Sequence, residues 1–415
     1  MSYYLIGHPL EHSCSPELHS YFGNDDYHLL DLQENELKRF FHQAEFDGIN
    51  VTIPYKKSIA AYVDVLSPRA QETGAINTVV HTRDGRLMGD NTDIDGMERM
   101  ISKASIDLEH KKTVILGTGG TAHTASFVAH KHGASDVILV SRTGSINYQN
   151  IYDQCADADV LINTTPVGMY PDLEGRPVDL SLFHHLKAVI DVVYNPLRTA
   201  LIMQARALGI PHVNGLRTLV EQARSAEELF FKRSVSDDEA NAAYDRLLRK
   251  HTSIVLIGMP GSGKTSVGKQ LAAQSGREFY DTDQMIVDAC GMEIPAIFEK
   301  YGEAYFRKCE KEAIKKVSGY QGIIIAVGGG APISDENKDF LLRNSRIYLL
   351  ERYLAQLDRS GRPLSSSSKV LEKMFETRMP HYLALADQTV SNHETLEHCA
   401  ELIGEDFHNY AGIGD

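Results

Sequence analysis

The amino-acid sequence predicts an α/β protein with largely parallel sheets. Short runs of β-branched and aliphatic residues alternate with segments of helical period along all 415 residues. Two glycine-rich loops, at 117–122 and 258–265, each follow such a run and precede a helical segment, as in nucleotide-binding α/β domains. The predicted strands include GINVTI, KTVIL, DVILV, DVLIN, AVIDVV, SIVLIG, GIIIAV and RIYLL.

The composition predicts a soluble globular protein of two or three domains, each of roughly 100–200 residues. A formal net charge of −14 argues against general binding to nucleic acid or to anionic membranes. The five cysteines are an odd number and form no C-x-x-C pair, which indicates neither a disulfide framework nor a zinc site. With no signal-peptide pattern and no apolar run of about 18 residues, we expect a cytoplasmic protein.

The segment HSCSPELH near the N-terminus predicts a helix that begins with polar side chains. Ser15 is expected to cap this helix, with Pro16 at its first position. Together with Ser13, the helix N-terminus could also hold a carboxylate.

The segment GINVTIPYKKSIAAYV predicts a strand ended by Pro54 and a helix from about Tyr55, with Lys56 in its first turn. The helix dipole disfavours a cation there, so a lysine with a lowered pKa that transfers protons is one reading, and a solvated surface lysine the other. Asp93 follows two further short strands. It could cap the next helix, or pair with Lys56 as an acid/base couple for oxidation of a hydroxyl.

The loop at 117–122 has the dinucleotide pattern G-x-G-x-x-A, with Gly117, Gly119 and Ala122 between a strand and a helix. A plain tight turn is the alternative. The next strand ends in Ser-Arg-Thr, where an NAD enzyme would carry an acidic residue, so Arg142 favours the 2′-phosphate of NADP over a role as a surface arginine.

The loop at 258–265 reads G-x-x-x-x-G-K-T, the pattern of a phosphate-binding loop. Its backbone amides would hold the phosphates of a nucleotide, Lys264 would reach the β and γ oxygens, and Thr265 would bind Mg²⁺. The pattern does not identify the acceptor of the phosphoryl group.

About the first 235 residues resemble shikimate dehydrogenase, because the family's motifs occur in order. These motifs are HSCSPELH, NVTIPYK, GAINTV, GDNTDIDG, GTGGTA, SRT, NTTPVGM, DVVYNPLRTALI and NGLRTLVEQA. The resemblance implies reversible reduction of 3-dehydroshikimate by NADPH, with Lys56 and Asp93 as the catalytic pair. It implies substrate contacts from Ser13, Ser15, Asn50, Thr52, Asn77, Tyr194 and Gln222, and cofactor contacts from Gly117, Gly119, Gly120, Arg142, Thr164, Met169 and Gly215.

One departure from that family is a short passage after Arg142. Only 20 residues (143–162) separate it from Asn163, where the family has a longer helix–strand passage. We expect a shortened nucleotide-binding half. This should change the pocket for the adenine end of the cofactor, and the cofactor affinity, more than the catalysed reaction.

The C-terminal residues, about 160 in number, resemble shikimate kinase through FYDTDQMIVDACGMEIPAIFEKYGEAYFRKCEKEAI and VGGGAP. The resemblance implies ATP binding by Gly258, Gly261, Ser262, Gly263, Lys264 and Thr265, Mg²⁺ binding by Thr265 and Asp281, and shikimate binding by Asp283, Arg307, Gly328, Gly329, Gly330 and Arg378. Asp283 would orient or deprotonate the acceptor hydroxyl. For Arg307, an ion pair with Glu303 or Glu310 on the same helix is the alternative. Arg362, in the segment that resembles the kinase lid, would close over the transferred phosphate.

The sequence therefore predicts two consecutive enzymes on one chain. We expect a substrate domain at 1–100, a Rossmann-like NADP domain at 101–235, a helical linker at 236–252 and a P-loop kinase with a parallel sheet at 253–415. The alternatives are a quinate/shikimate dehydrogenase of broader specificity on the same kinase, or one half that is inactive and serves as a binding module.

Overall fold

The computed structural model describes residues 2–10, 13–357 and 368–410, and these form two compact units. The first unit comprises residues 1–194 and 199–247, and the second comprises 195–198 and 248–414. Helix α9 (Asp237–His251) carries the chain from one to the other, as the apolar period of that segment predicts. Within the described ranges, no helix is long and apolar enough to cross a membrane.

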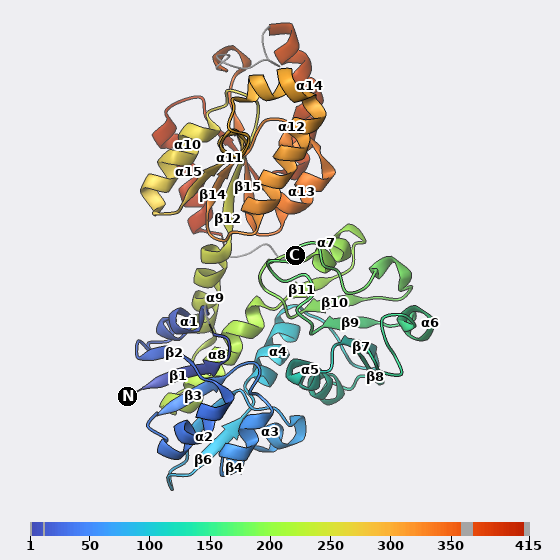
Figure 1. Cartoon of the computed structure of the whole chain (residues 1–415), viewed down its shortest axis with the longest axis vertical. Coiled ribbons are helices and arrows are strands. Elements are labelled where there is room, and N and C mark those ends of the chain that lie inside the picture. The colour runs from blue at the N-terminus through green and yellow to red at the C-terminus, as the bar shows by residue number, and fades with distance from the viewer. Residues whose placement is uncertain (1, 11–12, 358–367, 411–415) are drawn as a thin grey trace. The chain divides into compact units, whose positions relative to one another are not determined.

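The first unit begins with a six-stranded mixed sheet of order β2-β1-β3-β5-β6-β4 (Figure 1). Its strands are β1 (Tyr3–Gly7), β2 (Tyr27–Asp31), β3 (Gly48–Val51), β4 (Val65–Leu66), β5 (Thr78–His81) and β6 (Leu87–Asp90). The accompanying helices are α1 (Ser15–Tyr21), α2 (Glu34–Gln43), α3 (Pro68–Thr73), α4 (Asp93–Lys103) and the 3₁₀ helix η1 (Ser58–Tyr62). Strand β5 runs antiparallel to both β3 and β6.

A second, fully parallel sheet in the same unit has the order β11-β10-β9-β7-β8. Its elements are β7 (Lys112–Leu116), α5 (Gly120–Lys131), β8 (Asp136–Val140), α6 (Ile151–Cys155), β9 (Val160–Asn163), η2 (Leu180–Leu182), β10 (Ala188–Asp191), α7 (Ala200–Ala207), β11 (His212–Asn214) and α8 (Leu216–Phe231). The passage between β8 and β9 holds only the five-residue helix α6, so this half is as short as its sequence suggests.

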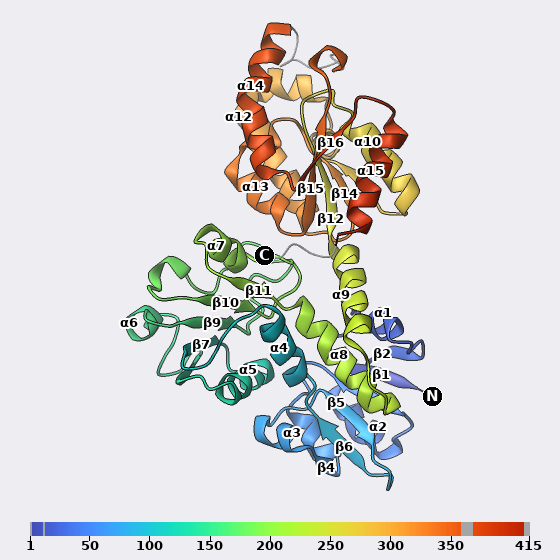
Figure 2. The ribbon, with the colours of Figure 1, turned by 180° about the vertical axis from the view of Figure 1, so that it is seen from behind.

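Apolar side chains bury both faces of the second sheet. Residues of α4 and α5 pack on one face, and residues of α6, η2 and α7 pack on the other. Helix α8 packs Ala226 and Phe230 against the first sheet and lies beside α4 in both views (Figures 1 and 2). Polar residues between α4, α8 and the strand ends are thereby brought into one place.

Two local expectations about the first unit are wrong. Helix α1 starts at Ser15 and is capped by Cys14, because the Leu18 amide already bonds the Cys14 carbonyl and Ser13 Oγ accepts the Ser15 amide. No α-helix follows Pro54: turns lead into η1, which begins two residues after Lys56. The helix dipole therefore does not set the environment of this lysine.

The second unit contains a five-stranded parallel sheet of order β13-β14-β12-β15-β16. Its strands are β12 (Ser253–Ile257), β13 (Phe279–Asp281), β14 (Ile324–Ala326), β15 (Ser345–Glu351) and β16 (Gln388–Ser391). The helices are α10 (Lys264–Ser275), α11 (Thr282–Cys290), α12 (Ile294–Ser318), α13 (Asp335–Leu342), α14 (Ser368–Leu385), α15 (Leu396–His408) and the 3₁₀ turns η3 (Ala331–Ile333) and η4 (Leu354–Gln356). Helices α10 and α15 cover one face of this sheet (Figure 2). Both units thus have the predicted α/β fold.

The end of β10 carries a buried carboxyl group, that of Asp191, whose protonation affects the stability of the folded state. Asp191 accepts hydrogen bonds from Asn163 Nδ2 at 3.0 Å, the Val193 amide at 3.1 Å and Thr199 Oγ1 at 2.6 Å. Burial raises its pKa to about 6 in spite of these bonds. A carboxyl group whose pKa is raised by folding favours the folded state while protonated, and this contribution is lost as pH rises through the folded-state pKa.

We predict that Asp191→Asn removes a pH-dependent loss of stability. The amide keeps the acceptor for Asn163 and Val193 but carries no charge. Between pH 4 and pH 7 the wild type should lose on the order of 2 kcal/mol relative to the variant. Urea unfolding of both proteins at the two pH values measures this difference, and an equal difference at both would contradict the prediction.

Candidate functional site

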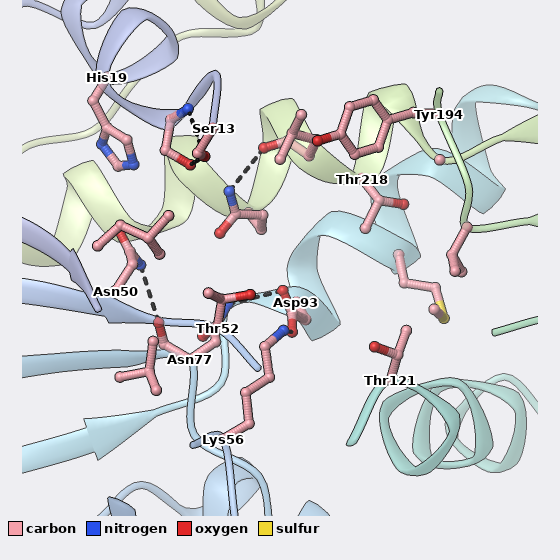
Figure 3. Close-up of a pocket in the computed structure, with 18 of the residues that line it drawn as sticks. Ser13, His19, Asn50, Thr52, Lys56, Asn77, Asp93, Thr121, Tyr194 and Thr218 are labelled. Atoms are coloured by element: carbon pink, nitrogen blue, oxygen red, sulfur yellow. Dashed lines mark hydrogen bonds and ion pairs between the residues drawn. The ribbon is translucent and has the colours of Figure 1, made fainter. Parts of the chain in front are cut away.

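A cavity of about 260 Å³ lies in the first unit, where the ends of β1 and β3 meet α1, α4 and α8 (Figure 3). Among its lining residues are all the side chains that the sequence implicates in substrate binding and catalysis by the dehydrogenase part. They are Ser13, Ser15, Asn50, Thr52, Lys56, Asn77, Asp93, Tyr194 and Gln222. Gly215, expected at the cofactor, lines it too.

The charged centre of this cavity is an ion pair. Lys56 Nζ donates to Asp93 Oδ2 at 2.5 Å, and the two side chains are 19% and 15% exposed. Asn77 Nδ2 donates to the other oxygen of Asp93 at 2.9 Å and to Thr92 Oγ1 at 3.0 Å. Asp93 is the first residue of α4, and Thr92 is the N-cap residue, so the carboxylate lies at the N-terminus of this helix.

Hydroxyl groups lie at the α1 side of the cavity. Ser13 Oγ donates to Ser15 Oγ at 3.0 Å and accepts the Ser15 amide at 3.1 Å. The hydroxyl of Tyr194 is 4.0 Å from Cys14 Sγ. Burial raises the pKa of Tyr194 well above its ordinary value, so this phenol keeps its proton as a hydrogen-bond donor.

Several lining residues were not predicted from the sequence. They are Leu5, His19, Tyr27, Val51, Met97, Thr121, Val192, Thr218 and Leu219. His19 carried a usable signal, because it lies four residues after Ser15 and one helical turn places both on the same face. Thr121 and Thr218 carried no such signal, since only the packing of α5 and α8 brings them to the cavity.

The predicted dinucleotide loop lies beside the cavity. Gly117 has φ +118°, and a methyl group there would lie 2.7 Å from Thr164 Oγ1. A methyl group on Gly119 would meet nothing within 4 Å, and one on Gly120 would lie 3.8 Å from Lys56 side-chain carbons. Thr121, the second residue of α5, faces the cavity (Figure 3). The N-terminus of α5 therefore reaches the Lys56–Asp93 pair.

The other predicted cofactor residues have different surroundings. Arg142 is exposed just beyond the end of β8, and Met169 is 45% exposed in the loop after β9. Gly215 packs so closely that a methyl group would lie 1.9 Å from the Val192 carbonyl oxygen. Packing against Val192 therefore requires a glycine at this position, whether or not a cofactor binds there.

In the second unit, the loop after β12 forms a compact cradle before α10. Gly258, Gly261 and Gly263 have φ of +143°, +83° and +94°, which disfavour any side chain. Lys264 Nζ donates to the carbonyls of Gly258 and Met259 at 3.0 and 3.1 Å.

Two further groups in this cradle bear on ligand binding. Ser262 Oγ is buried with no hydrogen-bond partner among the described residues. Thr265 Oγ1 donates to Asp281 Oδ2 at 2.6 Å. The unpartnered Ser262 hydroxyl suits a hydrogen bond to a phosphate oxygen. The adjacent oxygens of Thr265 and Asp281 suit a metal ion such as Mg²⁺.

Three loops meet at the same edge of this parallel sheet, because β13, β14 and β12 are neighbours. The Asp283 amide donates to Asp281 Oδ1 at 3.0 Å. A methyl group on Gly328 would lie 2.5 Å from Asp283 Oδ1, and one on Gly330 would lie 2.3 Å from Arg307 Nη1. The glycines therefore leave room for these charged side chains.

Arg307 forms the ion pairs that were its alternative interpretation. It donates to Glu303 Oε1 at 3.0 Å and to Glu310 Oε2 at 2.9 Å. Burial raises the pKa of Glu310 even though Arg307 opposes the shift. These pairs do not exclude ligand binding, since the Arg307 side chain is 34% exposed.

Arg378, the second arginine predicted to bind the shikimate carboxylate, lies in α14. A methyl group on Gly329 would lie 3.3 Å from Arg378 Nη1, so Arg378 belongs to the same cluster. Arg362 and the lid segment lie outside the described residues.

Comparison with known proteins identifies the two parts. The family model "Shikimate dehydrogenase substrate binding domain" matches residues 5–79, and "Shikimate kinase" matches residues 260–407. The shikimate dehydrogenase (NADP(+)) of Clostridium perfringens (strain SM101 / Type A) is 33% identical over 263 residues, which are 59% of this chain and 97% of that protein. The chain belongs to the shikimate dehydrogenase family. It is a fusion of such a dehydrogenase with a shikimate kinase domain, and both parts are enzymes.

Similar solved structures support the assignment of the dehydrogenase part. A chorismate mutase/shikimate 5-dehydrogenase fusion protein from Clostridium acetobutylicum is 31% identical with a TM-score of 0.56, covering 60% of this chain and 97% of that one. The quinate dehydrogenase from Corynebacterium glutamicum in complex with NAD is 27% identical with a TM-score of 0.53, covering 60% and 98%.

We predict that Gly215→Ala destabilises the dehydrogenase while Gly119→Ala does not. Both glycines have ordinary negative φ values of −76° and −80°, so backbone strain is matched and only the surroundings differ. The overlap with the Val192 carbonyl should reduce the free energy of unfolding by about 3 kcal/mol or more. Urea unfolding of the two variants measures this, and equal stability would contradict the steric argument.

Proposed function

We propose that the first unit reduces 3-dehydroshikimate to shikimate with NADPH, and that the second phosphorylates the 3-hydroxyl of shikimate with Mg·ATP. The observation that carries the first half is the Lys56–Asp93 ion pair inside a cavity lined by hydroxyl and amide groups. The product of the first reaction is the substrate of the second, which gives the fusion a chemical rationale.

In this proposal Lys56 supplies the proton of the dehydrogenase reaction. When a ketone is reduced, its oxygen gains negative charge and needs a proton from a positioned acid. Lys56 Nζ delivers that proton, and Asp93 orients the ammonium group through the 2.5 Å contact. Asn77 fixes Asp93 in turn. NADPH, when bound, supplies the hydride.

The other lining groups bind the rest of the substrate. Ser13 and Ser15, at the N-terminus of α1, hold the carboxylate together with Tyr194. The side chains that bind its hydroxyls are Asn50, Thr52, Asn77 and Gln222. All of these side chains carry hydroxyl or amide groups, which suit a small substrate rich in hydroxyls.

The residues around α5 fit a dinucleotide phosphate. Gly119 leaves the backbone open at a helix N-terminus, Gly117 lies against Thr164, and Gly120 lies beside Lys56. Arg142 would pair with the 2′-phosphate of NADP, in line with the NADP(+) named for the relative from Clostridium perfringens. Thr164, which neighbours Gly117, and Met169 would lie at the nicotinamide side.

In the kinase, the cradle of Gly258, Gly261 and Gly263 would hold the ATP phosphates, with Ser262 and Lys264 contacting their oxygens. The oxygens of Thr265 and Asp281 suit Mg²⁺, which, when bound, would offset phosphate charge. Asp283 would orient the acceptor hydroxyl. Arg307 and Arg378 would grip the shikimate carboxylate beside Gly328, Gly329 and Gly330.

One experiment tests both halves. The full chain is incubated with 3-dehydroshikimate, NADPH, ATP and Mg²⁺, and shikimate 3-phosphate is measured by mass spectrometry. Absence of NADPH oxidation would refute the first half, and accumulation of shikimate without phosphorylation would refute the second. Quinate formation or use at a comparable rate would indicate the broader dehydrogenase specificity instead.

Two variants of the full chain should separate the activities. Lys56→Ala removes the proton donor and should lower the reduction rate by a factor of about 10³, with phosphorylation of added shikimate within twofold of wild type. Lys264→Ala should do the reverse, because only the phosphate contacts of the kinase are lost. If either variant lost both activities, independent sites would be contradicted.

We predict that Arg142→Ala weakens NADP binding selectively. Since Arg142 is exposed and buries no core surface, its removal should leave folding unchanged. The KM for NADP should rise about tenfold or more, while the KM for NAD should change by less than twofold. Shikimate oxidation followed at 340 nm with each cofactor measures both constants, and parallel changes would refute the assignment.

A further inference from the structure

His19 is a buried histidine of the dehydrogenase cavity that none of the proposed steps uses. It is 1% exposed and lines the cavity from α1, one turn after Ser15. Figure 3 shows its ring at the cavity edge, near Asn50 and Ser13. The ring therefore belongs to the same wall as residues proposed to bind substrate.

One ring nitrogen of His19 is held from behind. Its Nδ1 contacts Glu227 Oε1, on the fully buried side chain of α8. Asn24 Nδ2 donates to the same oxygen at 2.9 Å, so this oxygen acts as an acceptor and Nδ1 carries the proton of the shared hydrogen bond. The contact with Glu227 thus turns Nδ1 away from the cavity and leaves Nε2 on the cavity side.

The plane of the ring is also fixed. His19 stacks on Tyr27 with ring centroids 3.8 Å apart and an interplanar angle of 8°. The Tyr27 hydroxyl donates to Asn50 Oδ1 at 2.8 Å, which ties this stack to a proposed substrate residue. Among the described residues, the only hydrogen bond of the His19 ring is the one from Nδ1 to Glu227. Nε2 is thus a preorganised polar atom without a protein partner at a cavity wall.

We propose that His19 is a further substrate-binding residue, whose Nε2 forms a hydrogen bond with a hydroxyl of the substrate that is not oxidised. This inference rests on the proposed dehydrogenase function. A hydroxyl fits this position because it can donate to a neutral imidazole and accept from a protonated one. The negative charge of Glu227 directly behind the ring makes it a poorer site for the substrate carboxylate, which has Ser13 and Ser15.

Energetics favour such a contact. A substrate that fills the cavity expels water, and Nε2 would then lose its only available partner. A ligand hydroxyl replaces that partner, whereas a ligand without it leaves a buried polar atom unsatisfied. His19 should therefore contribute to the discrimination between substrates that differ in one hydroxyl group.

Two substitutions separate binding from scaffolding. In His19→Asn the side-chain amide takes the place of Nδ1, so the Glu227 contact is kept and the group facing the cavity is lost. In His19→Gln the longer amide reaches the place of Nε2 and gives up Glu227. Shikimate oxidation by NADP in the absence of ATP is measured for both variants, so that the kinase does not consume the substrate.

The proposal predicts that His19→Asn raises the KM for shikimate about 10- to 100-fold with a smaller effect on kcat. His19→Gln should retain more of the affinity. The reverse order, with His19→Asn close to wild type and His19→Gln impaired, would mean that His19 serves only to hold Glu227 and would overturn the inference.

Substrate analogues give an independent test. Two analogues of shikimate each lack one of its non-reacting hydroxyls. The analogue that lacks the hydroxyl bound by His19 should have the same affinity for wild type and for His19→Asn, because it forms no hydrogen bond with Nε2 in either protein. If His19→Asn weakened the binding of both analogues as much as it weakens the binding of shikimate, the inference would be overturned. Kinase rate and circular dichroism on the same samples control for folding.

A spectroscopic test avoids reliance on the Asn variant. In ¹⁵N-histidine-labelled wild-type chain, the Nε2 resonance of His19, assigned by its absence in His19→Gln, should shift on addition of shikimate without ATP. No shift at saturating shikimate would overturn the inference. If wild type itself does not oxidise shikimate, the proposed function fails; if it does and these effects are missing, only the role of His19 fails.

Discussion

The dehydrogenase site depends on a single amide side chain, that of Asn77. It donates to Asp93 and Thr92, while its own oxygen accepts the Thr92 amide at 2.7 Å and Thr78 Oγ1 at 3.0 Å. Its backbone joins the ends of β3 and β6, through Val51 and Asp90. Because the polar groups of this side chain are satisfied in one geometry, the start of α4, and hence the Asp93 carboxylate, has one position relative to the sheet. Lys56 is oriented only as a consequence.

Both units have polar side chains at the ends of neighbouring strands. Parallel strands that are neighbours present their carboxyl ends at one edge, where loops and helix N-termini leave backbone amides unpaired. In the second unit, the loops after β12, β13 and β14 meet there. In the first unit, the N-termini of α1, α4 and α5 all contribute to the cavity wall. These amides suit anionic groups such as carboxylates and phosphates, which both proposed reactions involve.

Several expectations from the sequence failed where neighbours in space decide the outcome. Lys56 is not in a helix, and its partner Asp93 rather than a dipole sets its environment. Gly215 stays a predicted cofactor residue, but its lack of a side chain is already explained by the Val192 carbonyl, which leaves no room for one. The helical spacing from Ser15 indicates the face on which His19 lies, but the orientation of its ring depends on Glu227, which lies 208 residues further along the chain. Each case involves a contact between segments that are remote in sequence.

The sequence alone determined the α/β class, the strand–glycine–helix units and the residue types at both sites, because these follow from periodicity and from local backbone geometry. Ordered motifs also determined which two enzyme families the chain resembles. Only the tertiary structure decided that ten predicted dehydrogenase residues share one cavity, that Asn77 positions Asp93, and that one nitrogen of His19 faces that cavity. The physical reason is that hydrogen-bond partners and burial are set by the packing of α1, α4 and α8 against the sheet, which no local pattern encodes.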